Sequence, residues 1–343
     1  MSGFGKSVLV KGANTFSTKQ PVCEAKSEAG RGGVSPAERK ECRNAVSTHQ
    51  QGQSTRMFRM LLFSLTALSV MTVQAAAEEG KPVDRESAIC GKVKEPLVFW
   101  LWSAMAPRAD PTRLANDPGI EAVSFMTGDG KTLSGYKVRA HDGNGKPVKP
   151  EGYVLMALGN AMIADRMVRE LSVYGAHGYD AFIYDYRGYG LSEGKRRINA
   201  IIEDYREIVT DLNGKYHRKL LYGVSLGGMV MMNVIGSGVD FDAAVIDSSP
   251  SRMSTYGCPG RIDPVRHLSP GIATKLLVIT GKRDQVLSAG QTRELREQAA
   301  ALGAETIDDA AFAHPYMDHS AQVQMRRARL TRDHLLGPTQ TPE

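Results

Sequence analysis

The strongest constraint on the fold is a strand, a sharp turn and a helix centred on Ser225. An apolar run at residues 220–222 leads into Gly223-Val224-Ser225-Leu226-Gly227, and an apolar helical pattern begins after the serine. A run that ends at glycine and changes period so abruptly is typical of a buried strand turning into a helix. The two glycines leave room for the neighbouring strand and helix. We expect Ser225 to hold a strained backbone conformation, with its hydroxyl above the edge of the sheet.

These five residues fit the G-x-S-x-G pattern of serine nucleophiles. A pattern this short also occurs by chance in glycine-rich chains. The alternative to a nucleophile is a glycine-rich turn with a purely structural role. The strand before it and the helix after it favour the nucleophile. The free N–H groups at the start of such a helix also point toward negative charge that develops on a substrate.

Short apolar runs alternate with helical patterns in the rest of the chain. Residues 127–130, Thr-Gly-Asp-Gly, predict a hairpin between the first two strands. This order predicts a mostly parallel sheet covered on both faces, with ligands at the carboxyl ends of its strands. We expect strands at 121–125, 132–138, 154–158, 180–184, 220–222, 243–246, 275–280 and 305–307, and helices at 164–174, 198–212, 226–235, 291–302 and 321–336.

A second motif lies at residues 184–194, Tyr-Asp-Tyr-Arg-Gly-Tyr-Gly-Leu-Ser-Glu-Gly. Together with the serine motif, it resembles the α/β-hydrolase superfamily over residues 119–337, especially the serine-aminopeptidase-like and monoacylglycerol-lipase-like serine hydrolases. The resemblance implies an α/β-hydrolase fold with a mostly parallel eight-stranded sheet and helices on both faces. We interpret Arg187, Gly188 and Gly190 as turn architecture.

The resemblance implies an acid and a base after the serine in the chain. Asp284, in Thr280-Gly-Lys-Arg-Asp284, matches the position of the acid. His314 follows the last expected strand and is our base; His319, five residues later, is the alternative. A metal site formed by His314, Asp318 and His319 matches no standard spacing, so we expect no metal.

The resemblance also implies an oxyanion hole of backbone N–H groups. Gly159-Asn160-Ala161 resembles the H-G-N-A form, with Leu158 in place of the histidine. We expect the N–H of Leu226 and that of Asn160, or of Ala161, to face the oxyanion. The proline-rich stretch of about thirty residues between 246 and 275 predicts a minimal cap rather than a lid domain.

The N-terminal region divides into three expected segments. Residues 57–77 have a short basic start, an apolar stretch at 60–73 and a final Ala-Ala-Ala, which predicts a secretory signal peptide and a periplasmic or secreted protein. Residues 1–56 are interpreted as disordered or as a mis-assigned upstream segment. The alternative is an uncleaved internal anchor with a cytoplasmic tail. At the other end of the chain, residues 338–343 are expected to be a short tail.

Residues 78–118 are predicted to be an extension made irregular by Pro107, Pro111 and Pro118. Its apolar patch at 97–102 either touches a membrane surface or packs on the domain, and we favour packing. Cys90 and Cys258 are the only cysteines after residue 77. In an oxidising compartment they could form one disulfide; the alternative is two free buried thiols.

The charge of the chain indicates which kinds of partner it is unsuited to bind. The chain carries a net charge of +6, with 43 Lys and Arg and 37 Asp and Glu. Ten of these basic and four of these acidic residues precede residue 78, so the remainder is neutral, which argues against a nucleic-acid partner. We expect a small-molecule acyl substrate, no cofactor and no stable membrane span in the mature chain.

The expected function is hydrolysis of a carboxylic ester or thioester by Ser225, His314 and Asp284. An amide or peptide hydrolase uses the same machinery and remains an alternative. A non-catalytic binding protein of the same fold is the other, because the oxyanion loop lacks its histidine.

Overall fold

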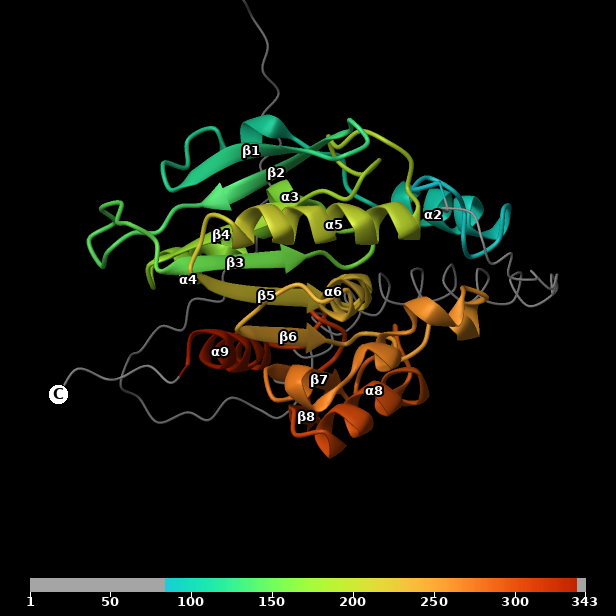
Figure 1. Ribbon diagram of the computed structural model, residues 1–343. Coiled ribbons are helices and arrows are strands. Elements are labelled where there is room, and N and C mark those ends of the chain that lie inside the picture. Colours follow the sequence, from blue (N-terminus) through green and yellow to red (C-terminus); the bar gives the residue numbers. More distant parts are fainter. Residues whose placement is uncertain (1–83, 338–343) are drawn as a thin grey trace, which may run out of the picture. The chain divides into compact units, whose positions relative to one another are not determined.

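The computed structural model describes residues 84–337 (Figure 1). The chain divides into two units, Met1–Ala76 and Ala77–Glu343, and all described residues belong to the second. The expected upstream segment 1–56, signal peptide 57–77 and tail 338–343 lie outside the described residues. Among the helices of 84–337, none is long and apolar enough to cross a membrane.

An eight-stranded sheet forms the centre of this unit, in the order β1-β2-β4-β3-β5-β6-β7-β8. β1 pairs with β2 and β2 with β4 antiparallel, and every other neighbouring pair is parallel. The predicted mostly parallel sheet is therefore confirmed. The strands are β1 Ile120–Met126, β2 Thr132–Val138, β3 Gly152–Ala157, β4 Tyr179–Tyr184, β5 Arg218–Val224, β6 Ala243–Asp247, β7 Leu276–Gly281 and β8 Glu305–Asp309.

Helices cover both faces of the sheet, as the alternation of side chains along β5 shows. Successive residues of a strand point to opposite faces. Gly223 lies against α6 (Leu226–Gly236), which packs beside α5 (Ile198–Asn213). Tyr222 faces the other way, toward a cavity between α4 (Ser172–Gly175) and α9 (Ala321–Leu336). β3 and β4 are buried along their whole length because both of their faces are covered.

Three predicted helices differ in how well they match the structure. The helix predicted at 164–174 is interrupted and consists of α3 (Ala164–Met167), the 3-10 helix η3 (Val168–Leu171) and α4. The closing helix, α9, has the predicted bounds. The helix predicted at 291–302 begins two residues earlier, as α8 (Ala289–Ala301), because Ser288 and Gln291 form a capping box.

The prediction of an irregular extension is wrong for residues 94–104. These residues form the helix α2 (Lys94–Ala104), which is followed by the 3-10 helix η2 (Pro111–Leu114). Pro96 does not prevent the helix because proline is tolerated in the first helical turn.

Only short helices separate β6 from β7, as expected for a minimal cap. They are η4 (Ser254–Tyr256), η5 (Gly260–Ile262), η6 (Pro264–His267) and α7 (Pro270–Ala273). We refer to residues 248–275 as the cap.

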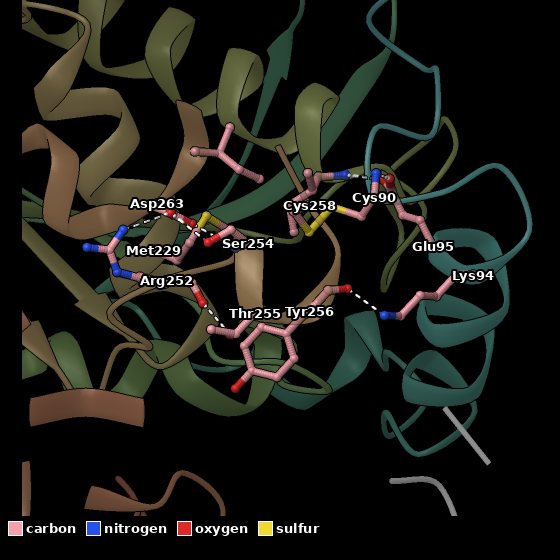
Figure 2. The surroundings of a disulfide bond; sticks show 12 residues. Cys90, Lys94, Glu95, Met229, Arg252, Ser254, Thr255, Tyr256, Cys258 and Asp263 are labelled. Atoms are coloured by element: carbon pink, nitrogen blue, oxygen red, sulfur yellow. Dashed lines mark hydrogen bonds and ion pairs between the residues drawn. A yellow bond between two sulfur atoms is a disulfide. The ribbon is translucent and has the colours of Figure 1, made fainter. Parts of the chain in front are cut away.

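A disulfide joins the extension to the cap. Cys90 and Cys258 are bonded, with an S–S distance of 2.08 Å, so of the two alternatives, a disulfide or two free thiols, the structure has the disulfide (Figure 2). Beside it, Lys94 Nζ donates to the carbonyl oxygen of Tyr256 over 2.6 Å. The start of α2 is therefore attached to the cap both covalently and by a hydrogen bond.

Candidate active site

Ser225 occupies the turn between β5 and α6. Its backbone is strained, with φ 54° and ψ −114°, and its side chain is largely buried. Its N–H donates to the carbonyl oxygen of Asp247, at the end of β6, over 2.8 Å. A Cβ on Gly223 would collide with the backbone of Gly227, and one on Gly227 with the carbonyl of Ala157. The turn thus depends on both glycines of the motif.

His314 and Asp284 meet at the same edge of the sheet. His314 follows β8, Asp284 follows β7, and His314 Nδ1 lies 2.8 Å from Asp284 Oδ2. A carboxylate at Nδ1 favours the tautomer with hydrogen on that nitrogen, which leaves Nε2 as the basic atom.

Asp284 is held in its ionised form. Burial opposes ionisation, but the hydrogen bond and charge of His314, together with the N–H groups of Leu287 and Val286, outweigh it and lower the pKa of Asp284. Both N–H groups donate to Asp284 Oδ1 over 2.8 Å. The carboxylate therefore has one oxygen fixed by its own loop and the other directed at His314.

Ser225 and His314 are not joined directly. Within residues 84–337, no hydrogen bond connects the Ser225 hydroxyl to His314. The N–H of Ser225 donates to the backbone of Asp247, and the charge of His314 lowers the pKa of the Asp247 side chain. His319, the alternative base, is exposed to solvent. Asp318 pairs with Arg327, over 3.0 Å.

The predicted oxyanion loop lies directly beside Ser225. A Cβ placed on Gly159 would lie 3.7 Å from Ser225 Cβ. The side chain of Asn160 accepts from the Tyr189 hydroxyl over 3.2 Å, and Ala161 has a positive φ of 60°. In the described part of the chain, the N–H groups of Asn160 and Leu226 donate to no other group, so both are free for a ligand.

Leu158 explains how the oxyanion loop is held in place without the histidine of the H-G-N-A form. Its side chain is completely buried, and its carbonyl oxygen accepts from the Tyr186 hydroxyl over 2.7 Å. The backbone entering the loop is fixed by packing and by this bond. A histidine side chain is therefore not needed to hold it.

The sequence patterns did not predict a buried charge cluster that lies next to the residues of the site. Arg327 of α9 pairs with Asp247 Oδ1 over 2.8 Å and donates to the carbonyl oxygen of Ala313, next to His314, over 2.6 Å. Asp247 is fully buried, and its Oδ2 has no hydrogen-bond partner within the described ranges. Burial raises the pKa of Asp247, opposed chiefly by the charge of Arg327. The signal was present, because Arg327 falls on the same helical stripe as the buried Thr331 and Leu335.

Arg187, interpreted as turn architecture, is completely buried in a second ionic network. Its guanidinium donates to Asp204 Oδ2 of α5 over 2.6 Å, to Asp129 Oδ2 of the hairpin over 2.9 Å and to Glu86 Oε1 of the extension over 3.1 Å. It therefore joins three parts of the chain away from Ser225. Gly190, in the same turn, has a φ of 51°, and a Cβ there would collide with the Asp185 carboxylate.

Parts of this chain are similar to known proteins. Residues 148–262 match the family described as serine aminopeptidase, S33. The uncharacterized protein YfhR of Escherichia coli (strain K12) is 26% identical over 190 residues, which are 50% of this chain and 66% of that protein. The match thus spans just under two thirds of the relative's own length.

Solved structures with this fold are similar over most of their length. The Pyrococcus furiosus esterase Pf2001 covers 66% of this chain and 95% of its own, with a TM-score of 0.50 and 18% identity. XC6422 from Xanthomonas campestris, described as an α/β serine hydrolase without lid, covers 69% of this chain and 100% of its own, with a TM-score of 0.50 and 12% identity. With the sheet order and the strained serine between β5 and α6, these matches show that the chain has the α/β-hydrolase fold.

Proposed function

We propose that this protein is a serine hydrolase that cleaves a carboxylic ester or thioester through an acyl-enzyme. The observation that carries the proposal is the 2.8 Å contact between His314 Nδ1 and Asp284 Oδ2, at the sheet edge where Ser225 occupies its strained turn. A buried carboxylate that orients a histidine is the arrangement that makes an imidazole a general base for a neighbouring hydroxyl.

In the first half of the reaction, Ser225 Oγ attacks the carbonyl carbon and His314 Nε2 takes the hydroxyl proton. The carbonyl electron pair moves to oxygen, where the N–H groups of Leu226 and Asn160 stabilise the charge. The tetrahedral intermediate collapses, and His314 gives its proton to the departing alcohol or thiol.

In the second half, His314 removes a proton from water, which attacks the acyl-enzyme. Collapse of this intermediate releases the carboxylic acid and returns the proton to Ser225. Asp284 stays ionised throughout and stabilises the imidazolium, which fits its lowered pKa.

An amide or peptide substrate is the second candidate. It is favoured by the match of residues 148–262 to a family described as serine aminopeptidase, whereas the similar Pyrococcus structure is described as an esterase. A non-catalytic binding protein is the third, and the substitution of Leu158 for the oxyanion-loop histidine is its support.

We also propose that the protein is exported. The Cys90–Cys258 disulfide supports this because disulfides persist in oxidising compartments. The signal-peptide pattern at residues 57–77 points the same way.

The test is hydrolysis by the full chain of matched soluble esters, thioesters and aminoacyl amides. Ser225→Ala should abolish turnover and keep the fold, and Ser237→Ala, at the far end of α6, should leave turnover unchanged. Ester turnover well above amide turnover supports the leading proposal, and the reverse order supports the second candidate. A Ser225→Ala variant as active as the wild type contradicts both.

A further inference from the structure

The helix α2 presents an apolar face to solvent. Trp100 is 61% exposed and Leu97 is 53% exposed, whereas Phe99, on the inner side, is 3% exposed. Leu101 is also exposed, as are Val93 and Met105, which flank the helix, and the spacing of these residues continues one stripe. The expectation that this patch packs on the domain is therefore correct for Phe99 and wrong for Leu97 and Trp100. We call the stripe Val93, Leu97, Trp100, Leu101 and Met105 the α2 face.

The ends of the α2 face are basic. Lys92 and Arg108 are exposed, and neither forms an ion pair or hydrogen bond with another residue of 84–337. Glu95, the acid of the helix, is buried and accepts from the N–H groups of Cys90 over 2.7 Å and Ile198 over 2.8 Å. The nearby Asp110 is engaged by Thr112 and Arg113. The face thus combines apolar side chains with unneutralised positive charge.

This combination is complementary to an anionic lipid surface. Apolar and aromatic side chains enter the boundary between headgroups and acyl chains, and Trp is favoured at that depth. Each exposed Lys or Arg near the surface adds to the binding by attraction to anionic headgroups.

The start of α2 is attached to the cap, and the cap is hydrogen-bonded to α8. Cys90 is bonded to Cys258 of the cap, and Lys94 is hydrogen-bonded to the Tyr256 carbonyl (Figure 2). The Tyr256 hydroxyl accepts from Gln291 of α8, the helix that begins after the Asp284 loop. In Figure 1, α2 lies at the end of the sheet toward which β3 and β6 point, which is the edge that carries Ser225.

We propose that the α2 face docks the protein on an anionic lipid surface, so that the active site receives acyl esters carried by that surface. The choice of substrate rests on the proposed hydrolase function, but the docking itself does not. A second copy of the chain and the apolar segment 60–73 are the competing occupants of the face.

The test uses Trp100 as its own reporter in the full chain. The chain has two tryptophans, so Trp102→Phe leaves Trp100 alone. We expect vesicles of phosphatidylcholine and phosphatidylglycerol to shift the Trp100 emission to shorter wavelength and protect it from iodide, and brominated acyl chains to quench it. Phosphatidylcholine alone should act more weakly.

Variants of the α2 face give the matched comparison. In the Trp102→Phe background, Leu97→Ser with Leu101→Ser should weaken vesicle binding by about tenfold or more. Lys92→Gln and Arg108→Gln should each weaken it by about fivefold, and only at low salt. Met126→Ser with Met325→Ser, which replace exposed methionines elsewhere, should have no effect.

Three results overturn the proposal. Iodide access to Trp100 that vesicles do not change excludes docking through this face. Protection without vesicles that rises with protein concentration, together with a dimer in sedimentation, assigns the face to a second copy. Protection of a monomer without vesicles assigns it to residues 60–73.

The docking and the hydrolase proposals fail separately. Ser225→Ala should bind vesicles as the wild type does, so vesicle binding without any turnover contradicts only the proposed function. For an active enzyme, Leu97→Ser with Leu101→Ser should slow hydrolysis of a vesicle-borne ester and leave that of a soluble ester unchanged. Equal slowing of both esters contradicts lipid docking as the route of substrate delivery.

Discussion

Arg327 Nη1 lies 2.8 Å from Asp247 Oδ1, and both side chains are almost completely buried. The pair joins α9 to the end of β6, whose last residue also accepts the N–H of Ser225. Through the Ala313 carbonyl, the same guanidinium holds the loop that carries His314. Arg327 therefore links the end of β6, which is bonded to Ser225, to the loop that carries His314.

Removal of Arg327 should destabilise the protein strongly. Arg327→Met leaves Asp247 and Asp318 buried without their partner, which typically costs about 3–5 kcal/mol in unfolding free energy. Denaturant unfolding measures the loss. Arg326→Met is the matched control, since the neighbouring arginine is 48% exposed where it pairs with Asp309. It should cost less than about 1 kcal/mol, and equal losses for the two variants would argue against a structural role for the cluster.

Asp284→Asn should lower kcat by about 10⁴-fold with little change in KM, because the amide no longer selects the tautomer of His314. Steady-state kinetics on a soluble ester measure both constants. His319→Ala provides the comparison, since this histidine is exposed, and its kinetics should match those of the wild type. Full activity of Asp284→Asn would remove Asp284 from the mechanism.

The same variant gives a prediction for pH. The pKa of Asp284 is lower in the folded protein than in the unfolded chain. Its ionised form therefore stabilises the fold at pH values above the ordinary pKa of aspartate. That contribution is lost as the pH falls through the folded-state pKa. The difference in unfolding free energy between wild type and Asp284→Asn should therefore shrink as the pH is lowered below about 4. If this difference in unfolding free energy grew as the pH fell, the pKa of Asp284 would not be lowered by folding.

Gly227→Ala should impair folding, because the added Cβ would collide with the carbonyls of Ala157 and Leu158 at the end of β3. Overpacking against backbone costs about 1–3 kcal/mol or more. Gly271→Ala is the control: a Cβ at Gly271 meets nothing within 4 Å. Thermal unfolding of the two variants should separate them clearly, and equal midpoints would contradict the close packing of the turn on β3.

Loss of the disulfide should lower stability and loosen α2. The bond closes a loop with a sequence separation of 168 residues. Its removal should cost about 2–5 kcal/mol. Cys90→Ser with Cys258→Ser, compared with the wild type in denaturant, measures this cost, and hydrogen exchange should speed up along residues 94–104. Reductant should reproduce the effect in the wild type and change nothing in the double variant. Unaltered stability would mean that the bond does not constrain the unfolded chain.

The sequence predicted the sheet and the turn at Ser225 well because both have strong local signals. Buried strands are apolar along their length, and the glycines at 223 and 227 mark the turn whatever surrounds it. The meeting of His314 with Asp284 could be anticipated because the ends of parallel strands share one edge.

Other features depend on contacts between distant segments. The α2 helix was not predicted because the prolines around it indicate irregular structure. The exposure of Trp100 depends on which side of the helix packs against the domain. The pairing of Arg327 with Asp247 joins residues 80 positions apart. A buried arginine in a helix signals that a partner exists, but only the folded chain identifies it.

The most direct test of the proposed mechanism is covalent labelling of the full chain by a fluorophosphonate, followed by intact mass and peptide mapping. We expect one adduct, on Ser225, that is lost in Ser225→Ala, strongly slowed in His314→Ala and unchanged in Ser237→Ala. A folded wild-type protein that forms no adduct, or forms it at another serine, would contradict the proposal that His314 and Asp284 activate Ser225.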